Sequence, residues 1–98
     1  MHVLVCDDDS ATRLVVTRIV AHRFGCQVSE CADGAAALQF ISQQAVDLLL
    51  LDLQMPRLDG FATIERIRAL DSEAVIVVVT TYPGDGHAVR ALQAGASA

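Results

Sequence analysis

Polar side chains end three apolar runs of this chain, at positions where such residues rarely serve packing. They are Asp7 and Asp8 after the first run, Asp52 after a run of leucines, and Thr80 after a run of valines. Carboxylates about 4 Å apart repel by roughly 4 kcal/mol per pair at an effective dielectric near 20, so a cluster of them needs a cation. Mg²⁺ prefers such oxygen ligands and keeps a position open for a phosphate oxygen. These residues predict an acidic Mg²⁺ site.

A second interpretation of the first acids is that they only cap a helix, where a negative charge stabilises the N-terminus by about 0.3–1 kcal/mol. We assign this role to Asp9, which stands next to Ser10 at the expected helix start. Asp7 and Asp8 are expected to act with Asp52 instead, because all three follow inner strands of one sheet.

The chain alternates between strand-like and helix-like patterns. Strands are expected at 2–6, 26–31, 48–51 and 74–79, and helices at 10–24, after Asp33-Gly34, at 61–70 and at 85–94. In the first helix the apolar stripe Val15, Val16, Ile19, Val20 and Phe24 is expected to face the core, with Arg13, Arg18 and Arg23 outside it. The second helix should bury Ala37, Leu38 and Ile41, and the third Phe61, Ile64 and Ile67.

This alternation favours an α/β fold with a parallel sheet and helices on both faces. The segment 26–31 alternates weakly, which favours an edge strand. The continuous apolar runs at 48–51 and 74–79 should be covered on both faces. Because ligands bind at the carboxyl ends of such strands, the acids and Thr80 are expected to share one site.

Composition narrows the function further. The chain has 98 residues, 53% of them hydrophobic, which suits one domain. A net charge of −5 argues against direct contact with nucleic acid or an anionic membrane. No apolar run is long enough for a membrane span and no secretory signal is present, so we expect a cytoplasmic protein. The cysteines, Cys6, Cys26 and Cys31, lack a CxxC spacing, and we expect three buried thiols without a metal or disulfide role.

Four segments together resemble the receiver domain of bacterial two-component response regulators. They are Val3–Ser10 with Arg13, then Asp52–Gly60, Val78–Thr81 and Ala94–Ser97. An acidic pair alone is a weak signal, but an acidic pair, D-x-x-M-P-x-x-D-G and a strand-end Thr in this order form a strong one. The resemblance implies a flavodoxin-like, doubly wound parallel sheet of strand order 2-1-3-4.

The resemblance also implies roles for individual residues. Asp52 would be the phospho-acceptor that takes a phosphoryl group from a phosphohistidine on a sensor histidine kinase. Asp8 would bind Mg²⁺ directly, Asp7 would assist through water, and the backbone carbonyl of Gln54 would be a further ligand. Thr80 would be the switch residue that contacts the phosphoryl oxygens. Such a domain is a phosphorylated signalling switch rather than an enzyme.

The chain departs from the family pattern at its C-terminal end. Family members carry a lysine at the end of a fifth strand, whereas this sequence ends at Ala98 and contains no lysine. We therefore expect residues 1–98 to be a C-terminally incomplete receiver domain. Completion by another molecule stays open, and with it a homodimer contact. The segment 80–85 looks most like receivers that precede a LuxR-type helix-turn-helix domain, so DNA binding in transcription regulation would belong to an output domain beyond this chain.

Two other functions compete with this interpretation. A haloacid-dehalogenase-like phosphohydrolase would also use an aspartate at a strand end, but its D-x-D motif is not matched by Asp52-Leu53-Gln54. A pseudo-receiver would keep the fold and serve only protein contacts. Retention of Asp7, Asp8, Asp52 and Thr80 argues against that alternative.

Overall fold

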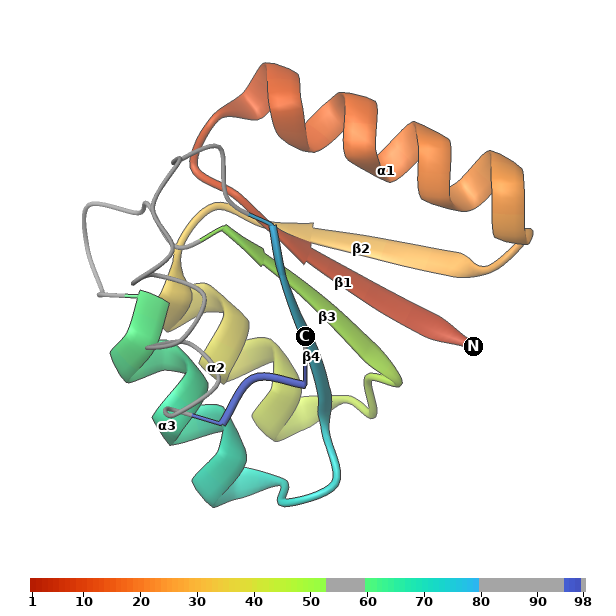
Figure 1. Cartoon of the computed structure of the whole chain (residues 1–98). Helices are drawn as coiled ribbons and strands as arrows, with labels where there is room; N and C mark the ends of the chain where they lie inside the picture. The colour runs from red at the N-terminus through yellow and green to blue at the C-terminus, as the bar shows by residue number, and fades with distance from the viewer. Residues whose placement is uncertain (53–59, 80–94, 98) are drawn as a thin grey trace.

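The fold is an α/β sandwich built on a parallel sheet (Figure 1). The computed structural model describes residues 1–52, 60–79 and 95–97. The strands are β1 (His2–Cys6), β2 (Gln27–Cys31), β3 (Leu48–Asp52) and β4 (Val75–Val79), and the helices are α1 (Ser10–Phe24), α2 (Gly34–Gln43) and α3 (Gly60–Leu70). The order β2-β1-β3-β4 confirms the flavodoxin-like fold predicted from the sequence. The helix expected at 85–94 lies outside the described residues.

The register of the strands aligns their carboxyl ends. Cys6 of β1 lies opposite Cys31 of β2 and Leu51 of β3. Asp52, one residue further along β3, pairs with Val79 at the end of β4. The residues that come after β1 and those that end β3 are therefore delivered to the same edge of the sheet.

Asp9, the predicted cap, and Gly25 set the two ends of α1. Asp9 is the N-cap, and its carboxylate accepts hydrogen bonds from the Ala11 backbone N–H and the Thr12 hydroxyl. Gly25 ends the helix in the left-handed conformation, with φ at 59°, and donates its backbone N–H to the carbonyl of Ala21. At α2, Asp33 caps the helix by accepting from the backbone N–H of Ala36.

The sequence predicted the wrong set of buried residues in α1. Only Val20 is buried and Val16 half-buried, whereas Val15, Ile19 and Phe24 are 55%, 55% and 69% exposed. Val16 and Val20 are four residues apart and share the face that meets the sheet, while Val15 and Ile19 are turned about 100° away. A stripe wide enough to include all five positions exceeds what the flat sheet can cover.

The two faces of the sheet are covered unequally. The side that α2 and α3 cover holds the larger core, and α1 lies alone among the described helices on the other side (Figure 1). In β3 the side chains alternate accordingly: Leu49 and Leu51 are buried against α2 and α3, and Leu48 and Leu50 are half-buried toward α1. Both faces of this strand are covered, as predicted, but the face toward α1 is covered less completely, because α1 packs over β1 and β2.

The helices of the larger core follow the sequence prediction more closely. Ala37 of α2 is buried, and Leu38 and Ile41 are half-buried against the same cluster. In α3, Ile64 and Ile67 are fully buried, as predicted, and the side chain of Phe61 lies outside the described residues.

The short segment 95–97 is anchored to β4. Ser97 donates its backbone N–H to the carbonyl of Ile76, and its hydroxyl accepts from the backbone N–H of Ile76. Arg68 of α3 adds hydrogen bonds from its guanidinium to the carbonyls of Ser72, Ala74 and Gly95. Among the described parts of the chain, no helix has the length and apolarity needed to cross a membrane.

Candidate functional site

Three carboxylates meet at the carboxyl edge of the sheet. Asp7 and Asp8 follow β1, Asp52 ends β3, and one oxygen of each lies within 4.8 Å of the others. Asp7 is buried, Asp52 is half-buried and Asp8 is exposed, so the cluster opens outward on the side of Asp8. The parallel register explains this convergence, since β1 and β3 are neighbours in the sheet.

Asp7 is held on both its side chain and its backbone. Its carboxylate accepts the backbone N–H of Asp9 at 2.9 Å, and its own backbone N–H donates to the carbonyl of Cys31 at 3.1 Å. Its carbonyl accepts from the guanidinium of Arg13 at 2.7 Å. These contacts fix the direction in which the Asp7 carboxylate points before any ligand binds.

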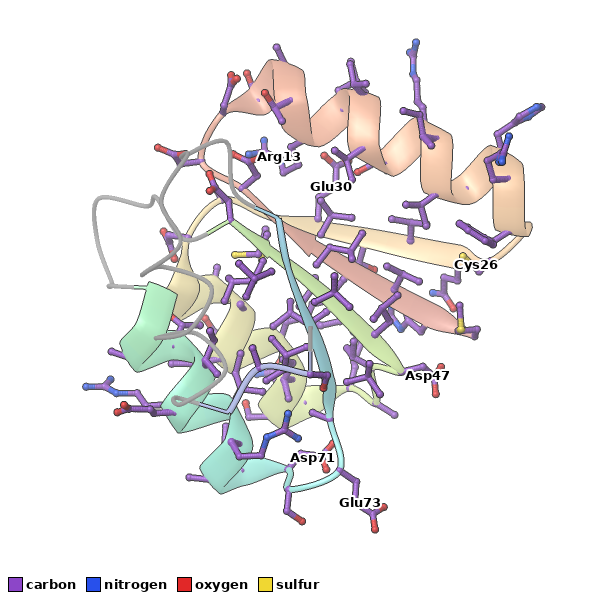
Figure 2. All side chains as sticks on the ribbon, viewed as in Figure 1. Arg13, Cys26, Glu30, Asp47, Asp71 and Glu73 are labelled. Atoms are coloured by element: carbon purple, nitrogen blue, oxygen red, sulfur yellow. The ribbon has the colours of Figure 1, made fainter. Side chains whose placement is uncertain are left out.

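Arg13 positions the backbone of Asp7 and does not neutralise the acidic cluster. Its Nε lies 3.1 Å from a carboxylate oxygen of Glu30, and its Nη1 donates to the backbone of Asp7 (Figure 2). Its side chain is 20% exposed, although it was expected to lie outside the apolar stripe on the solvent side. The helical pattern alone does not reveal these contacts, because one partner of Arg13 follows β1 and the other lies on β2.

Asp9 stays outside the metal-binding cluster, as the capping interpretation predicted. Hydrogen bonds from the Thr12 hydroxyl and then the Ala11 backbone lower the pKa of its carboxyl below the ordinary value. Asp9 is therefore ionised at neutral pH and fixed at the N-terminus of α1. It contributes to the site through its backbone N–H, which orients Asp7.

The donor set fits a hard divalent cation. Its three side chains offer only carboxylate oxygens, and the chain contains no lysine that could neutralise them. Arg13 is bound to a carbonyl and to Glu30. Mg²⁺ suits this arrangement because it binds through few carboxylates, keeps several waters and accepts a phosphate oxygen. The arrangement can thus hold a metal ion beside a nucleophilic carboxylate.

The predicted site is only partly covered by the described residues. The structure brings Asp7, Asp8 and Asp52 together. Gln54, whose backbone carbonyl was expected to complete the metal site, and Thr80, the expected switch, both lie outside the described residues. The sequence did not predict the hydrogen bond between the Cys31 carbonyl and the backbone N–H of Asp7, because that contact depends on the register between β1 and β2.

Doubly wound parallel domains with acids at the carboxyl ends of their inner strands include a class of signalling proteins. The response regulator receiver domain family matches residues 3–98. The chain belongs to this family, which places it in two-component signal transduction and not in a classical enzyme family.

Individual proteins agree with this assignment. A putative transcriptional regulator of Pseudomonas aeruginosa is 39% identical over 95 residues, which cover 96% of this chain and 45% of that protein. The receiver structure of a LuxR-family response regulator from Aurantimonas sp. SI85-9A1 superposes with a TM-score of 0.92 at 30% identity, covering 98% of this chain and 69% of that one. The chain therefore spans less than half the length of this curated relative.

A third similar protein was solved with ligands. The receiver domain of the histidine kinase CKI1 from Arabidopsis thaliana, in complex with Mg²⁺ and BeF₃⁻, has a TM-score of 0.88 at 26% identity. The alignment covers 97% of this chain and 76% of that one. The likeness extends over the sheet that carries the acidic cluster.

Proposed function

We propose that this chain is a phosphoryl-accepting switch whose acceptor is Asp52. The observation that carries the proposal is the convergence of three carboxylates within 4.8 Å where β1 and β3 end. Membership in the receiver family and the Mg²⁺ complex of a similar receiver domain support the same interpretation. The proposed phosphoryl donor is a phosphohistidine on a sensor histidine kinase.

Each residue of the site would have its own role in the phosphoryl transfer. A carboxylate oxygen of Asp52 attacks the phosphorus in line, the phosphorus–nitrogen bond of the phosphohistidine breaks, and its electron pair returns to the imidazole. Mg²⁺, when bound, offsets the charge on the transferred phosphoryl oxygens. Asp8 and Asp52 would hold the ion, Asp7 would orient its bound water, and the Gln54 carbonyl would complete the set. Asp7 is prepared for this role by the backbone contacts described above.

The acyl phosphate would then bias a two-state element of the domain. We assign the readout to the hydroxyl of Thr80, which would bond to the phosphoryl oxygens and move the surface around it. The output would be a DNA-binding domain outside this chain, since the Pseudomonas aeruginosa relative is named a transcriptional regulator. We place the protein in the cytoplasm on the same basis, and we propose the apolar β4 as the contact of a homodimer.

The proposal is tested with a small phosphodonor. Acetyl phosphate with Mg²⁺ should add one phosphoryl group to the intact protein by mass spectrometry, and hydroxylamine should remove it as expected for an acyl phosphate. Asp52→Asn should stay unlabelled, and EDTA should block labelling of the wild type. Asp47→Asn is the matched control, because Asp47 is exposed and precedes β3 at the opposite end from Asp52 (Figure 2).

Equal labelling of wild type and Asp52→Asn would overturn the assignment. Labelling that survives EDTA would remove the metal from the mechanism. If no variant takes up phosphate and Mg²⁺ does not bind in titration, the pseudo-receiver alternative is favoured.

A further inference from the structure

Two cysteines face each other across neighbouring strands. Cys6 of β1 and Cys31 of β2 are direct partners in the parallel register. Neighbouring strands lie about 4.7–4.9 Å apart, which falls within the 4.4–6.8 Å range of Cα separations seen in disulfides. Both side chains belong to the core cluster on the α2 side of the sheet. They therefore project to the same side at a separation that a disulfide can bridge.

The Cys6 thiol is held in place on this side of the sheet. It donates a hydrogen bond to the carbonyl oxygen of Asp33, with the sulfur 3.2 Å from that oxygen. The neighbouring Cys31 thiol and then burial raise the pKa of Cys6 above its ordinary value.

Cys31 is the member of the pair that a small molecule can reach. A hollow of about 250 Å³ between β2 and α2 is lined by Glu30, Cys31, Ala36, Gln39, Phe40 and Gln43. Since β2 is an edge strand of the described sheet, this hollow opens at the margin of the molecule. Cys6 is 1% exposed and Cys31 is 9% exposed, so the approach to the pair passes Cys31.

The third cysteine serves as an internal reference. Cys26 precedes β2 at the end opposite to Cys31 and packs with Val3, Val5 and Val20 on the α1 side of the sheet. Its sulfur lies 4.0 Å from the carbonyl oxygen of Val20. The sheet separates it from the other two thiols, so Cys26 has no route to a disulfide within the folded chain.

We propose that Cys6 and Cys31 form a reversible disulfide when the protein meets hydrogen peroxide. The sulfur of Cys31 attacks one peroxide oxygen, the oxygen–oxygen bond breaks, and one water leaves with a sulfenic acid on Cys31. The sulfur of Cys6 then attacks the Cys31 sulfur, the sulfur–oxygen bond breaks and a second water leaves. Two thiols lose two electrons and two protons, and one peroxide becomes two waters.

Both cysteines of the disulfide are connected to Asp7 of the acidic site. Cys6 is followed by Asp7, and the carbonyl of Cys31 accepts the backbone N–H of Asp7 at 3.1 Å. A bond between the two sulfurs shifts both ends of this contact and moves the Asp7 carboxylate relative to Asp52. Formation of the disulfide is independent of the proposed function, whereas this effect on metal binding rests on it.

The pairing is tested on the wild-type chain first. After peroxide treatment in native buffer, denaturation and alkylation with N-ethylmaleimide, the protein should carry one maleimide, on Cys26, instead of three. A tryptic peptide of residues 1–13 should be linked to the peptide of residues 24–57, with the maleimide located on Cys26 by fragmentation. Dithiothreitol should restore three alkylated thiols.

Variants supply the matched comparison. Cys26→Ser should still lose both remaining thiols, whereas Cys31→Ser should leave Cys6 available to maleimide; circular dichroism of each variant verifies folding. The same oxidation in urea should give mixed pairings, because unfolded chains do not select one. Preferential loss of Cys26, linkage between molecules, or sulfinic acid on Cys31 with maleimide still added to Cys6 would each overturn the proposal.

Mg²⁺ titration separates the regulatory consequence from the chemistry. Displacement of groups that orient metal ligands typically weakens binding about 10–100-fold, so the oxidised chain should bind Mg²⁺ at least about tenfold more weakly than the reduced chain. Equal affinities in the presence of the mapped disulfide would reject the coupling to the acidic site. Absence of Mg²⁺ binding in the reduced chain would instead count against the proposed function.

Discussion

Asp7 and Asp8 are neighbours in sequence, yet their surroundings differ. Asp7 is buried and its carboxylate accepts a backbone N–H, while Asp8 is exposed beside the other two carboxylates. The repulsion that Asp8 feels is thus partly screened by water, and its cost is well below that of a buried pair. Removing its charge should relieve this repulsion without breaking a cap, because the cap of α1 is Asp9.

We predict that Asp8→Asn raises the melting temperature in EDTA by roughly 2–5 °C, the equivalent of about 0.5–1 kcal/mol in a domain of this size. With saturating Mg²⁺ the order should reverse, since the ion stabilises the form that binds it and the wild type binds it better. Calorimetry under both conditions checks this. Glu65→Gln, which removes the same charge from an exposed position of α3, should show neither effect. A lower melting temperature of Asp8→Asn in EDTA would mean that Asp8 stabilises the fold directly.

Among individual residues, the sequence predicted the groups at the strand ends and missed those that pair across strands. The convergence of Asp7, Asp8 and Asp52 could be anticipated because the carboxyl ends of parallel strands meet at one edge. The cysteines were predicted as three buried thiols without a metal or disulfide role. Cys26 is only half-buried, and Cys6 meets Cys31 because of a strand register that spacing along the chain does not encode.

Among the elements, the connection between α3 and β4 depends on Arg68. Its guanidinium donates two bonds to the carbonyl of Gly95, at 2.6 and 3.2 Å, and reaches the carbonyls of Ser72 and Ala74. Gly95 has φ at 123°, a conformation that side chains rarely adopt, and a Cβ there would meet Arg68 at 3.4 Å. The hydrogen bonds from Arg68 to Gly95 tie the segment 95–97 to the end of α3.

We predict that Arg68→Ala lowers the free energy of unfolding by about 1.5–3 kcal/mol, because several carbonyls lose a charged donor. Arg68→Lys should recover only part of this stability, since the ammonium group of lysine cannot reproduce the planar set of donors of a guanidinium. Urea unfolding measures both. Arg66→Ala, an exposed neighbour in the same helix, is the control and should change stability by less than about 0.5 kcal/mol. Equal losses for the two alanine variants would show that the hydrogen bonds of Arg68 add nothing.

Element boundaries were predictable because local chemistry determines them. Asp9 and Asp33 cap the helices at the positions where the sequence placed the helix starts. The orientation of α1 was not predictable in the same way, because its apolar residues occupy more of the helix than one sheet contact can bury. Which of them face inward depends on how the helix lies over β1 and β2, a property of tertiary packing.

Over the whole molecule, the sheet divides the apolar side chains into two clusters of unequal size. Leu4, Leu49 and Ile76 lie in the cluster under α2 and α3, and Val3 and Val5 lie in the one under α1. The strand order could be inferred from family resemblance. The difference between the faces could not, because a run of four leucines looks the same whether one face or both are fully covered.

This inequality makes adjacent leucines of β3 differ in what they contribute. Leu49 is 1% exposed against α2 and α3, and Leu50 is half-buried toward α1. We predict that Leu49→Ala lowers the free energy of unfolding by about 2–5 kcal/mol, through lost burial and the cavity left behind. Leu50→Ala should cost about half as much or less, because solvent and neighbouring side chains can close the gap. Urea midpoints at an unchanged slope give the comparison, and equal losses would show that both faces of the sheet are packed alike.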